Sequence, residues 1–246
     1  MANQKLLENL PQAVSEAVKV YWSTRERQSQ RQKATGVVDQ GLRSAVTGGA
    51  QMNGFVQLIT NLVLEAGVDR ACVHYNESLE LPGYFRPTKR WDLVVVVDGR
   101  FIAALEAKSQ VGPSFGNNFN NRTEEAMGSA LDLWTAFREN AFKSNIRPLL
   151  GYFFLLEDCP ASTTPVGVKE PLFKVFPEFR NSSYAQRYAL FCERLVLERQ
   201  YDVAAFLMSD RLSGANGVYS EPVPGLTFER FAHALVAAQS GKIKKL

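Results

Sequence analysis

The sequence predicts an α/β protein built on a mixed central β-sheet that is flanked by helices. Residues 91–110 contain two apolar, β-rich runs on either side of an Asp-Gly pair, which is typical of an antiparallel hairpin. The apolar runs at 149–158 and 203–209 predict two further strands, and each follows a segment with helical character. A hairpin combined with strands that alternate with helices indicates one mixed sheet.

The segments before the hairpin are mostly helical in pattern. Apolar side chains recur every three or four residues across 4–33, which predicts a helix. A second predicted helix covers 51–66 and stops near Gly67. A short strand at 71–76 and a Pro- and Gly-containing loop then lead into the hairpin.

After the hairpin, the pattern predicts a polar, Gly- and Asn-rich loop at 109–121. A long helix at 123–140 follows it, and further helices are predicted at 183–200 and 227–239. Both strands of the hairpin are nearly continuous in apolar residues. We therefore expect helices to cover the sheet on both faces.

Composition favours one domain spanning residues 1–246, since 46% of the residues are hydrophobic and no linker or repeat interrupts the chain. We expect an N-terminal helical part at about 1–70, a core at about 71–210 and a C-terminal helix at about 227–239. The start of the chain lacks a secretory pattern, and no apolar run approaches the roughly 20 residues that cross a bilayer. The sequence therefore predicts a cytoplasmic protein with no membrane partner.

Cysteine and histidine usage argues against a zinc site. Cys72, Cys159 and Cys192 are widely spaced among apolar neighbours, as expected of reduced residues in the cytoplasm. The chain has only two histidines, and no pair of cysteines has metal-ligand spacing. The net charge of +3 permits a nucleic-acid partner without requiring one.

Glu106-Ala107-Lys108 is the only place where an acidic residue precedes a lysine by two positions. Residues two apart on a strand point to the same face, so Glu106 and Lys108 project together from an otherwise apolar strand. Burying charged groups is unfavourable unless they are paired. The alternative interpretation is a structural salt bridge at a strand end, but the apolar setting and an aspartate on the preceding strand favour a catalytic role.

Asp92, at the start of the partner strand, joins this face only with a particular hairpin register. A regular two-residue turn would place Trp91 opposite Glu106 and turn Asp92 to the other face. A three-residue loop ending in a left-handed Gly99, or a bulge elsewhere in the hairpin, restores the shared face. We therefore predict the three-residue loop or a bulge.

Two carboxylates and an ammonium on one face suit phosphodiester hydrolysis. Asp92 and Glu106 offer the hard oxygen ligands that Mg²⁺ prefers, and Mg²⁺ retains several waters in such sites. The metal stabilises charge on the phosphate and activates a water. Lys108 can orient that water or stabilise the transition state, and the acid–base assignment stays open.

These residues resemble a known family. The hairpin with Asp92, Glu106 and Lys108 resembles the PD-(D/E)XK nucleases, and the stretch 87–134 is similar to the XhoI family of type II restriction endonucleases. By position the three residues match the catalytic Asp, Glu and Lys of that family. The sequence departs from the short motif because no proline immediately precedes Asp92, the nearest being Pro87.

The resemblance implies a restriction-endonuclease-like core and a homodimer that acts on double-stranded DNA. The expected target is the palindrome CTCGAG, cut in each strand after the first C with Mg²⁺, which leaves 5′ overhangs and 5′-phosphates. It also implies a bacterial source and a companion DNA methyltransferase of the same specificity. The alternatives are a structure- or end-directed repair or recombination nuclease of the same fold, and a DNA-binding protein without activity.

Further candidates concern DNA contacts. The polar loop after the catalytic strand offers amide and guanidinium groups that can contact base edges: Gln110, Asn117, Asn118, Asn120, Asn121 and Arg122. Candidates for phosphate contacts are Arg25, Arg27, Arg31, Lys33, Arg43 and Lys89. Glu65, near the end of the second predicted helix, is a candidate for an additional acidic residue. Solvated helix ends and a helix-capping loop are the alternatives for these groups.

Overall fold

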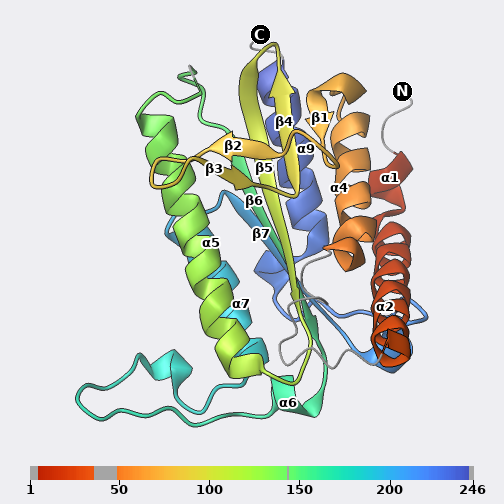
Figure 1. Cartoon of the computed structure of the whole chain (residues 1–246), viewed down its shortest axis with the longest axis vertical. Coiled ribbons are helices and arrows are strands. Elements are labelled where there is room, and N and C mark those ends of the chain that lie inside the picture. The colour runs from red at the N-terminus through yellow and green to blue at the C-terminus, as the bar shows by residue number, and fades with distance from the viewer. Residues whose placement is uncertain (1–4, 36–48, 143, 244–246) are drawn as a thin grey trace.

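A computed structural model describes residues 5–35, 49–142 and 144–243 (Figure 1). Its central sheet has five strands in the order β1 (Val73–His74), β4 (Leu93–Val97), β5 (Arg100–Gln110), β6 (Leu149–Glu157) and β7 (Val203–Ser209). The pairs β1–β4 and β4–β5 are antiparallel, whereas β5–β6 and β6–β7 are parallel. The predicted mixed sheet is therefore confirmed.

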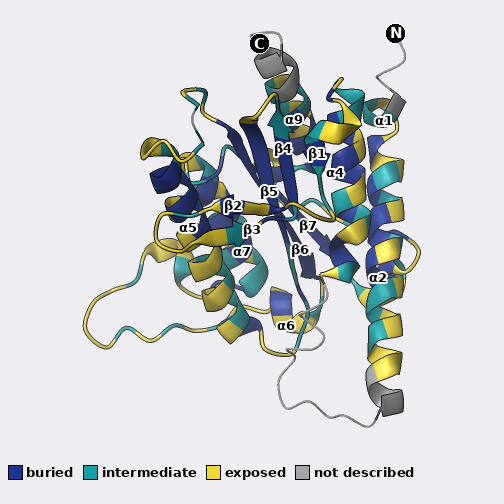
Figure 2. Cartoon of the chain, turned by 45° about the horizontal axis from the view of Figure 1, so that its top comes forward, coloured by how far each residue is buried: buried dark blue, intermediate teal, exposed yellow. Residues whose placement is uncertain are grey.

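Helices cover both faces of this sheet, which gives three layers (Figure 1). On one face, α2 (Leu10–Thr35), α4 (Asn53–Glu65) and α9 (Phe228–Ile243) contribute to one apolar cluster with the strands. On the other, α5 (Phe115–Arg138) and α7 (Tyr184–Leu197) contribute to a second cluster. Figure 2 shows the strands buried between these layers, which explains their nearly continuous apolar sequence.

A small antiparallel sheet of β2 (Glu80–Pro82) and β3 (Thr88–Arg90) crosses the sheet on the side of α5 (Figure 1). Short helical turns connect the larger elements: α1 (Lys5–Glu8), η1 (Ala50–Met52), η2 (Arg70–Cys72), α6 (Pro160–Thr163), η3 (Pro177–Phe179), α8 (Arg211–Gly214) and η4 (Pro224–Leu226). Within the described ranges, no helix combines the length and apolar character that a membrane crossing requires.

The N-terminal helix differs from the prediction of one continuous element over 4–33. It is divided at Asn9 into α1 and α2. Pro11 explains the break, because its ring lacks an N–H and crowds the carbonyl four residues earlier. Proline is tolerated in the first turn, so α2 begins beside it and continues to Thr35.

The predicted loop at 109–121 is wrong in most of its length. Strand β5 continues to Gln110, and α5 already begins at Phe115. The reason is tertiary packing, because the ring of Phe115 stacks on Tyr184 and the ring of Phe119 packs edge-on against Tyr188. These contacts outweigh the low helix propensity of the intervening Gly and Asn residues.

The hairpin has a two-residue turn, so the predicted three-residue loop is wrong. Asp98 and Gly99 both adopt positive φ, at 50° and 72°, and Val97 pairs with Arg100. An Asp-Gly pair is favoured in such a turn because both central residues must be left-handed.

The alternative prediction, a bulge elsewhere in the hairpin, is confirmed. The register shifts between Val95, which pairs with Ala103, and Val96, which pairs with Phe101. Beyond the bulge, Val94 pairs with Ala104, and both side chains pack in the cluster beneath α5 and α7. Since faces alternate along a strand, the bulge turns the positions two residues further along, 92 and 106, to that same face.

Candidate active site

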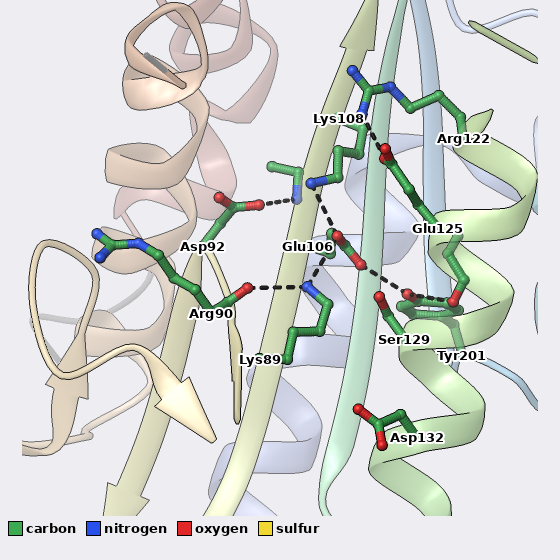
Figure 3. A network of polar contacts seen from close by, with 12 residues as sticks. Lys89, Arg90, Asp92, Glu106, Lys108, Arg122, Glu125, Ser129, Asp132 and Tyr201 are labelled. Carbon is green, nitrogen blue, oxygen red and sulfur yellow. Dashed lines mark hydrogen bonds and ion pairs between the residues drawn. The ribbon is translucent and has the colours of Figure 1, made fainter. Parts of the chain in front are cut away.

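The structure brings Asp92, Glu106 and Lys108 together (Figure 3). Glu106 is 2% exposed, and the Lys108 Nζ atom lies 2.9 Å from its Oε1 atom. The Asp92 carboxylate accepts a 2.8 Å hydrogen bond from the backbone N–H of Ala107, between the other two residues. Adjacent strands therefore hold the two carboxylates and the ammonium at one place on the sheet.

Two more groups hold the Glu106 carboxylate. The Lys89 Nζ atom, from β3, lies 3.1 Å from the same Oε1 atom. The Tyr201 hydroxyl, which follows α7, donates to Oε2 at 3.1 Å. Lys89 also donates to the carbonyl of Arg90 at 3.0 Å, and its Nζ atom lies 4.2 Å from the ring centroid of Trp91. Glu106 is thus a buried charge whose partners come from β3, from β5 and from the segment before β7.

These contacts set the protonation states. Burial alone would raise the pKa of Glu106, but the Lys108 and Lys89 ammonium groups outweigh burial and hold that pKa below its ordinary value. Burial lowers the pKa of Lys89, whereas Glu106 and Asp92 overcome burial and raise the pKa of Lys108. Burial, followed by the Glu106 charge, raises the pKa of Tyr201 well above its ordinary value, so its hydroxyl remains a proton donor.

Two cavities open on this group. The first, of about 190 Å³, is lined by Asp92 and Lys108 together with Arg25, Asn118 and Arg122 from the flanking helices. The second, of about 730 Å³, is lined by Glu106 and by lysines and arginines that include Lys89, Lys108 and Arg122. Lys108 and Arg122 border both cavities, so a bound phosphate at Lys108 would face cations from several elements.

The carboxylate pair suits Mg²⁺ better than a transition metal. Among the residues that the structure describes, no group of three or more His, Cys, Asp or Glu side chains could enclose a metal ion. Magnesium needs no such cage, because it retains waters and is bound by one or two carboxylates plus substrate phosphate. Asp92 and Glu106 would provide that donor set.

The candidates for base contacts fall into two groups. Gln110 borders the first cavity but is only 4% exposed and accepts a hydrogen bond from the buried Tyr188 hydroxyl, so its side chain is anchored in the core. The others lie on the first turns of α5 instead of on a loop. Asn118 and Arg122 line the first cavity, and the remaining three are exposed: Asn117, Asn120 and Asn121.

Of the phosphate-contact candidates, Arg25 lines the first cavity, and Arg27 and Arg31 are exposed further along α2. Lys89 points inward to Glu106. Lys33 belongs to α2, but its side chain lies outside the described part of the structure. Arg43 lies outside the described residues altogether.

The structure does not bring Glu65 to this group. Its carboxylate accepts a 3.1 Å hydrogen bond from the backbone N–H of Leu6, at the C-terminal end of α4. The turn η1, which precedes α4, places Gln51 and Met52 on the wall of the first cavity. Near this end of α4 the cavity wall therefore carries the Gln51 amide, not the predicted carboxylate.

Comparison with known proteins identifies the family. The model of the family described as restriction endonuclease XhoI matches residues 31–221. This chain belongs to the XhoI family of type II restriction endonucleases. It is 54% identical over 203 residues to the type II restriction enzyme BstVI of Geobacillus stearothermophilus, covering 80% of this chain and 91% of that protein.

Two further relatives carry the same description. The chain is 50% identical to the type II restriction enzyme AbrI of Azospirillum brasilense, over 65% of this chain and 72% of the relative. It is 47% identical to the type II restriction enzyme XhoI of Xanthomonas vasicola, over 64% of each chain. No solved structure matches the chain significantly. The XhoI-family chain is therefore a site-specific deoxyribonuclease that binds DNA.

The hairpin pattern did not predict that three further residues of this XhoI-family site would lie beside the catalytic group. Tyr201 stands 95 residues from Glu106 in sequence, and no local pattern marks it. Gln51, 8% exposed, lies in η1 just before α4, whereas the predicted acidic residue, Glu65, lies at the far end of that helix. Lys89 carried a signal, since it belongs to the basic cluster just before Asp92, but its contact with Glu106 depends on how β3 crosses the sheet.

Proposed function

We propose that this enzyme cuts the palindrome CTCGAG in double-stranded DNA after the first C of each strand, with Mg²⁺ as cofactor. Asp92, Glu106 and Lys108 are its catalytic residues in this proposal. The resemblance of residues 87–134 to the XhoI family supports the proposed target and cut position. The supporting observation is the convergence of Asp92, Glu106 and Lys108 on one face, which a hairpin without the bulge would not permit.

The chemistry is hydrolysis of one phosphodiester in each strand. The oxygen of a water molecule forms a bond to phosphorus, and the bond from phosphorus to the 3′ oxygen breaks. The products are a 5′-phosphate and a 3′-hydroxyl, which takes up a proton. Bound Mg²⁺ would supply stabilisation of the phosphate charge and a more acidic water.

The residues of the chain have distinct tasks. Asp92 and Glu106 would hold the metal, because both residues line the cavities beside Lys108 and carry the hard oxygen ligands that Mg²⁺ takes. The Lys108 ammonium orients the attacking water and offsets negative charge that develops on the phosphate. The inward contact with Glu106 fixes this ammonium, so it needs little reorganisation when DNA binds.

The DNA lies across both cavities in this proposal, with the reacting phosphate at Lys108, which borders each of them. Arg25, Lys108 and Arg122 place positive charge there, and phosphate contacts of this kind position a duplex without reading its sequence. The exposed amides at the start of α5 would contact base edges, where asparagine pairs well with adenine. These are Asn117, Asn120 and Asn121.

A palindrome calls for two active sites related by a two-fold axis. We therefore propose a homodimer in which each subunit cuts one strand. Such an enzyme in a bacterial cytoplasm needs a companion methyltransferase of the same specificity to protect the host DNA.

The test is digestion of a circular plasmid that contains one CTCGAG sequence, with Mg²⁺ present. We expect one linear product whose mapped ends are 5′ overhangs that begin after the first C. A plasmid in which CTCGAG is changed at one base pair serves as the matched control and should remain intact. Discrete cutting at another sequence would reject the proposed target, and a smear would favour the repair or recombination nuclease.

A further inference from the structure

Two ammonium groups contact a single oxygen of the Glu106 carboxylate. Lys108, from the motif itself, lies 2.9 Å from Oε1, and Lys89, from a different sheet, lies 3.1 Å from the same atom. The Lys89 side chain is 12% exposed, and its Nζ atom is held by the Trp91 ring and the Arg90 carbonyl. The carboxylates of Asp92 and Glu106 balance these two ammonium groups, so a divalent ion bound there would leave excess positive charge that a further negative charge must offset.

A count of formal charges indicates what that negative charge is. Asp92, Glu106 and Lys108 together carry one net negative charge, and one divalent ion would make this one net positive charge. Attack of hydroxide on a phosphodiester produces a transition state with two negative charges. The motif with one ion therefore leaves one negative charge unbalanced, and a second ion would overbalance it. Arg25 and Arg122 also border the cavities, but Lys89 is held against the Glu106 carboxylate, so its ammonium would supply this single charge nearest to the expected metal ligand.

The ligand set supports the same conclusion. Sites with two metal ions place them about 3.5–4 Å apart, and each ion needs protein oxygen ligands. Asp92 and Glu106 are the two carboxylates that converge here, and two ammonium groups already contact the Glu106 Oε1 atom. Lys89 also lines the second cavity with Lys108 and Arg122, so a phosphate can reach it.

We propose that Lys89 is a catalytic residue whose ammonium takes the place of a second metal ion, so that each active site works with one divalent ion. This inference rests on the proposed function. The sequence suggested that Lys89 contacts a backbone phosphate and thereby positions the DNA. In the present proposal the Lys89 ammonium acts on the phosphate that reacts.

The first test counts ions and needs no variant. Calorimetric titration of Ca²⁺, as the probe ion, into the wild-type enzyme bound to a CTCGAG duplex should give one ion per subunit. Two ions per subunit would overturn the proposal. If the wild-type enzyme does not cut CTCGAG with Mg²⁺ at all, the proposed function has failed, which is a different result.

The second test removes the charge. Lys89→Met should lower the single-turnover cleavage rate at saturating Mg²⁺ at least tenfold, while Ca²⁺ binding and DNA binding in Ca²⁺ are not weakened more than threefold. Lys89→Arg, which keeps the charge, should recover part of the lost rate. Lys174→Met is the matched control, because it removes a lysine from an exposed ion pair with Glu170.

A fall of less than tenfold in Lys89→Met would overturn the proposal. So would a loss of Ca²⁺ or DNA binding as large as the loss of rate, because that pattern indicates a structural role. If Lys89→Met fails to fold, as shown by its thermal melt, the ion count in the wild-type enzyme still decides the question.

Discussion

Replacing Tyr201 with phenylalanine removes one hydroxyl, which contacts the Glu106 carboxylate and lies 3.2 Å from the Ala126 carbonyl oxygen. The hydroxyl donates to Oε2 at 3.1 Å, and both side chains are buried. The phenylalanine ring would keep the packing of Tyr201 against Tyr152, whose ring centroid lies 5.1 Å away. Without this donor, only the two lysines on Oε1 hold the carboxylate, so it is free to rotate about its last side-chain bond.

The size of the effect follows from the position of the hydroxyl. Outer groups that orient a metal ligand typically change metal affinity by about 10–100-fold when they are removed. At about 1.36 kcal/mol for each factor of ten, this is a loss of roughly 1.4–2.7 kcal/mol in metal binding. We therefore expect the Mg²⁺ concentration for half-maximal cleavage to rise by that factor, while the rate at saturating Mg²⁺ changes little.

Two assays and two matched variants check this prediction. Mg²⁺ titrations of cleavage and Ca²⁺ calorimetry should shift together in Tyr201→Phe. Tyr188→Phe removes a hydroxyl that donates to the buried Gln110, and Tyr152→Phe removes a buried hydroxyl for which the described residues offer no hydrogen-bond partner. Neither should shift the metal dependence. A shift in Tyr201→Phe no larger than that in Tyr188→Phe would refute the reasoning.

Three further predictions concern charge. Glu106→Gln removes the charge that both lysines face and one expected metal ligand, so single-turnover cleavage should fall at least about 100-fold, and near wild-type cutting would contradict the proposed site. Arg122→Ala should weaken the salt dependence of binding to a CTCGAG duplex in Ca²⁺: the negative slope of the logarithm of the binding constant against the logarithm of the salt concentration should shrink in magnitude by about 0.9. An unchanged slope would show that Arg122 does not contact a phosphate. Burial alone would raise the pKa of Asp132, but bonds from Phe85, Arg86 and Tyr84 outweigh burial and hold it below its ordinary value. Asp132 therefore stabilises the fold at neutral pH and loses this effect as pH falls through the lowered pKa, so melts of Asp132→Asn should be destabilised at pH 7 but approach wild type below about pH 4.

The sequence was sufficient to predict the part of the site that depends on alternation along a strand. Glu106 and Lys108 share a face because they are two residues apart, and the parity argument required an irregular hairpin before Asp92 could join them. The irregularity itself could not be located, because a turn and a bulge correct the parity equally well. The strong preference of Asp-Gly for a two-residue turn decided between them.

The parts that could not be predicted depend on packing between distant segments. The polar stretch before Thr123 looks like a loop by composition, yet Phe115 and Phe119 find aromatic partners on α7 and the segment becomes helical. Tyr201 reaches Glu106 because β7 lies two strands away in the same sheet. Contacts of this kind have no local signature, since they exist only after the layers have assembled.

The position of the bulge separates two parts of the hairpin. Between the bulge and the catalytic end, β5 pairs with β6 without interruption from Ala103 to Gln110, so the buried parallel neighbour holds that length of strand in place. The position of Glu106 therefore does not depend on the conformation of the exposed tip at Gly99. A short peptide tag or a fluorophore-bearing loop can therefore be inserted at this tip. The insertion would disturb only the strand ends between the turn and the bulge, so the labelled enzyme would still cut DNA.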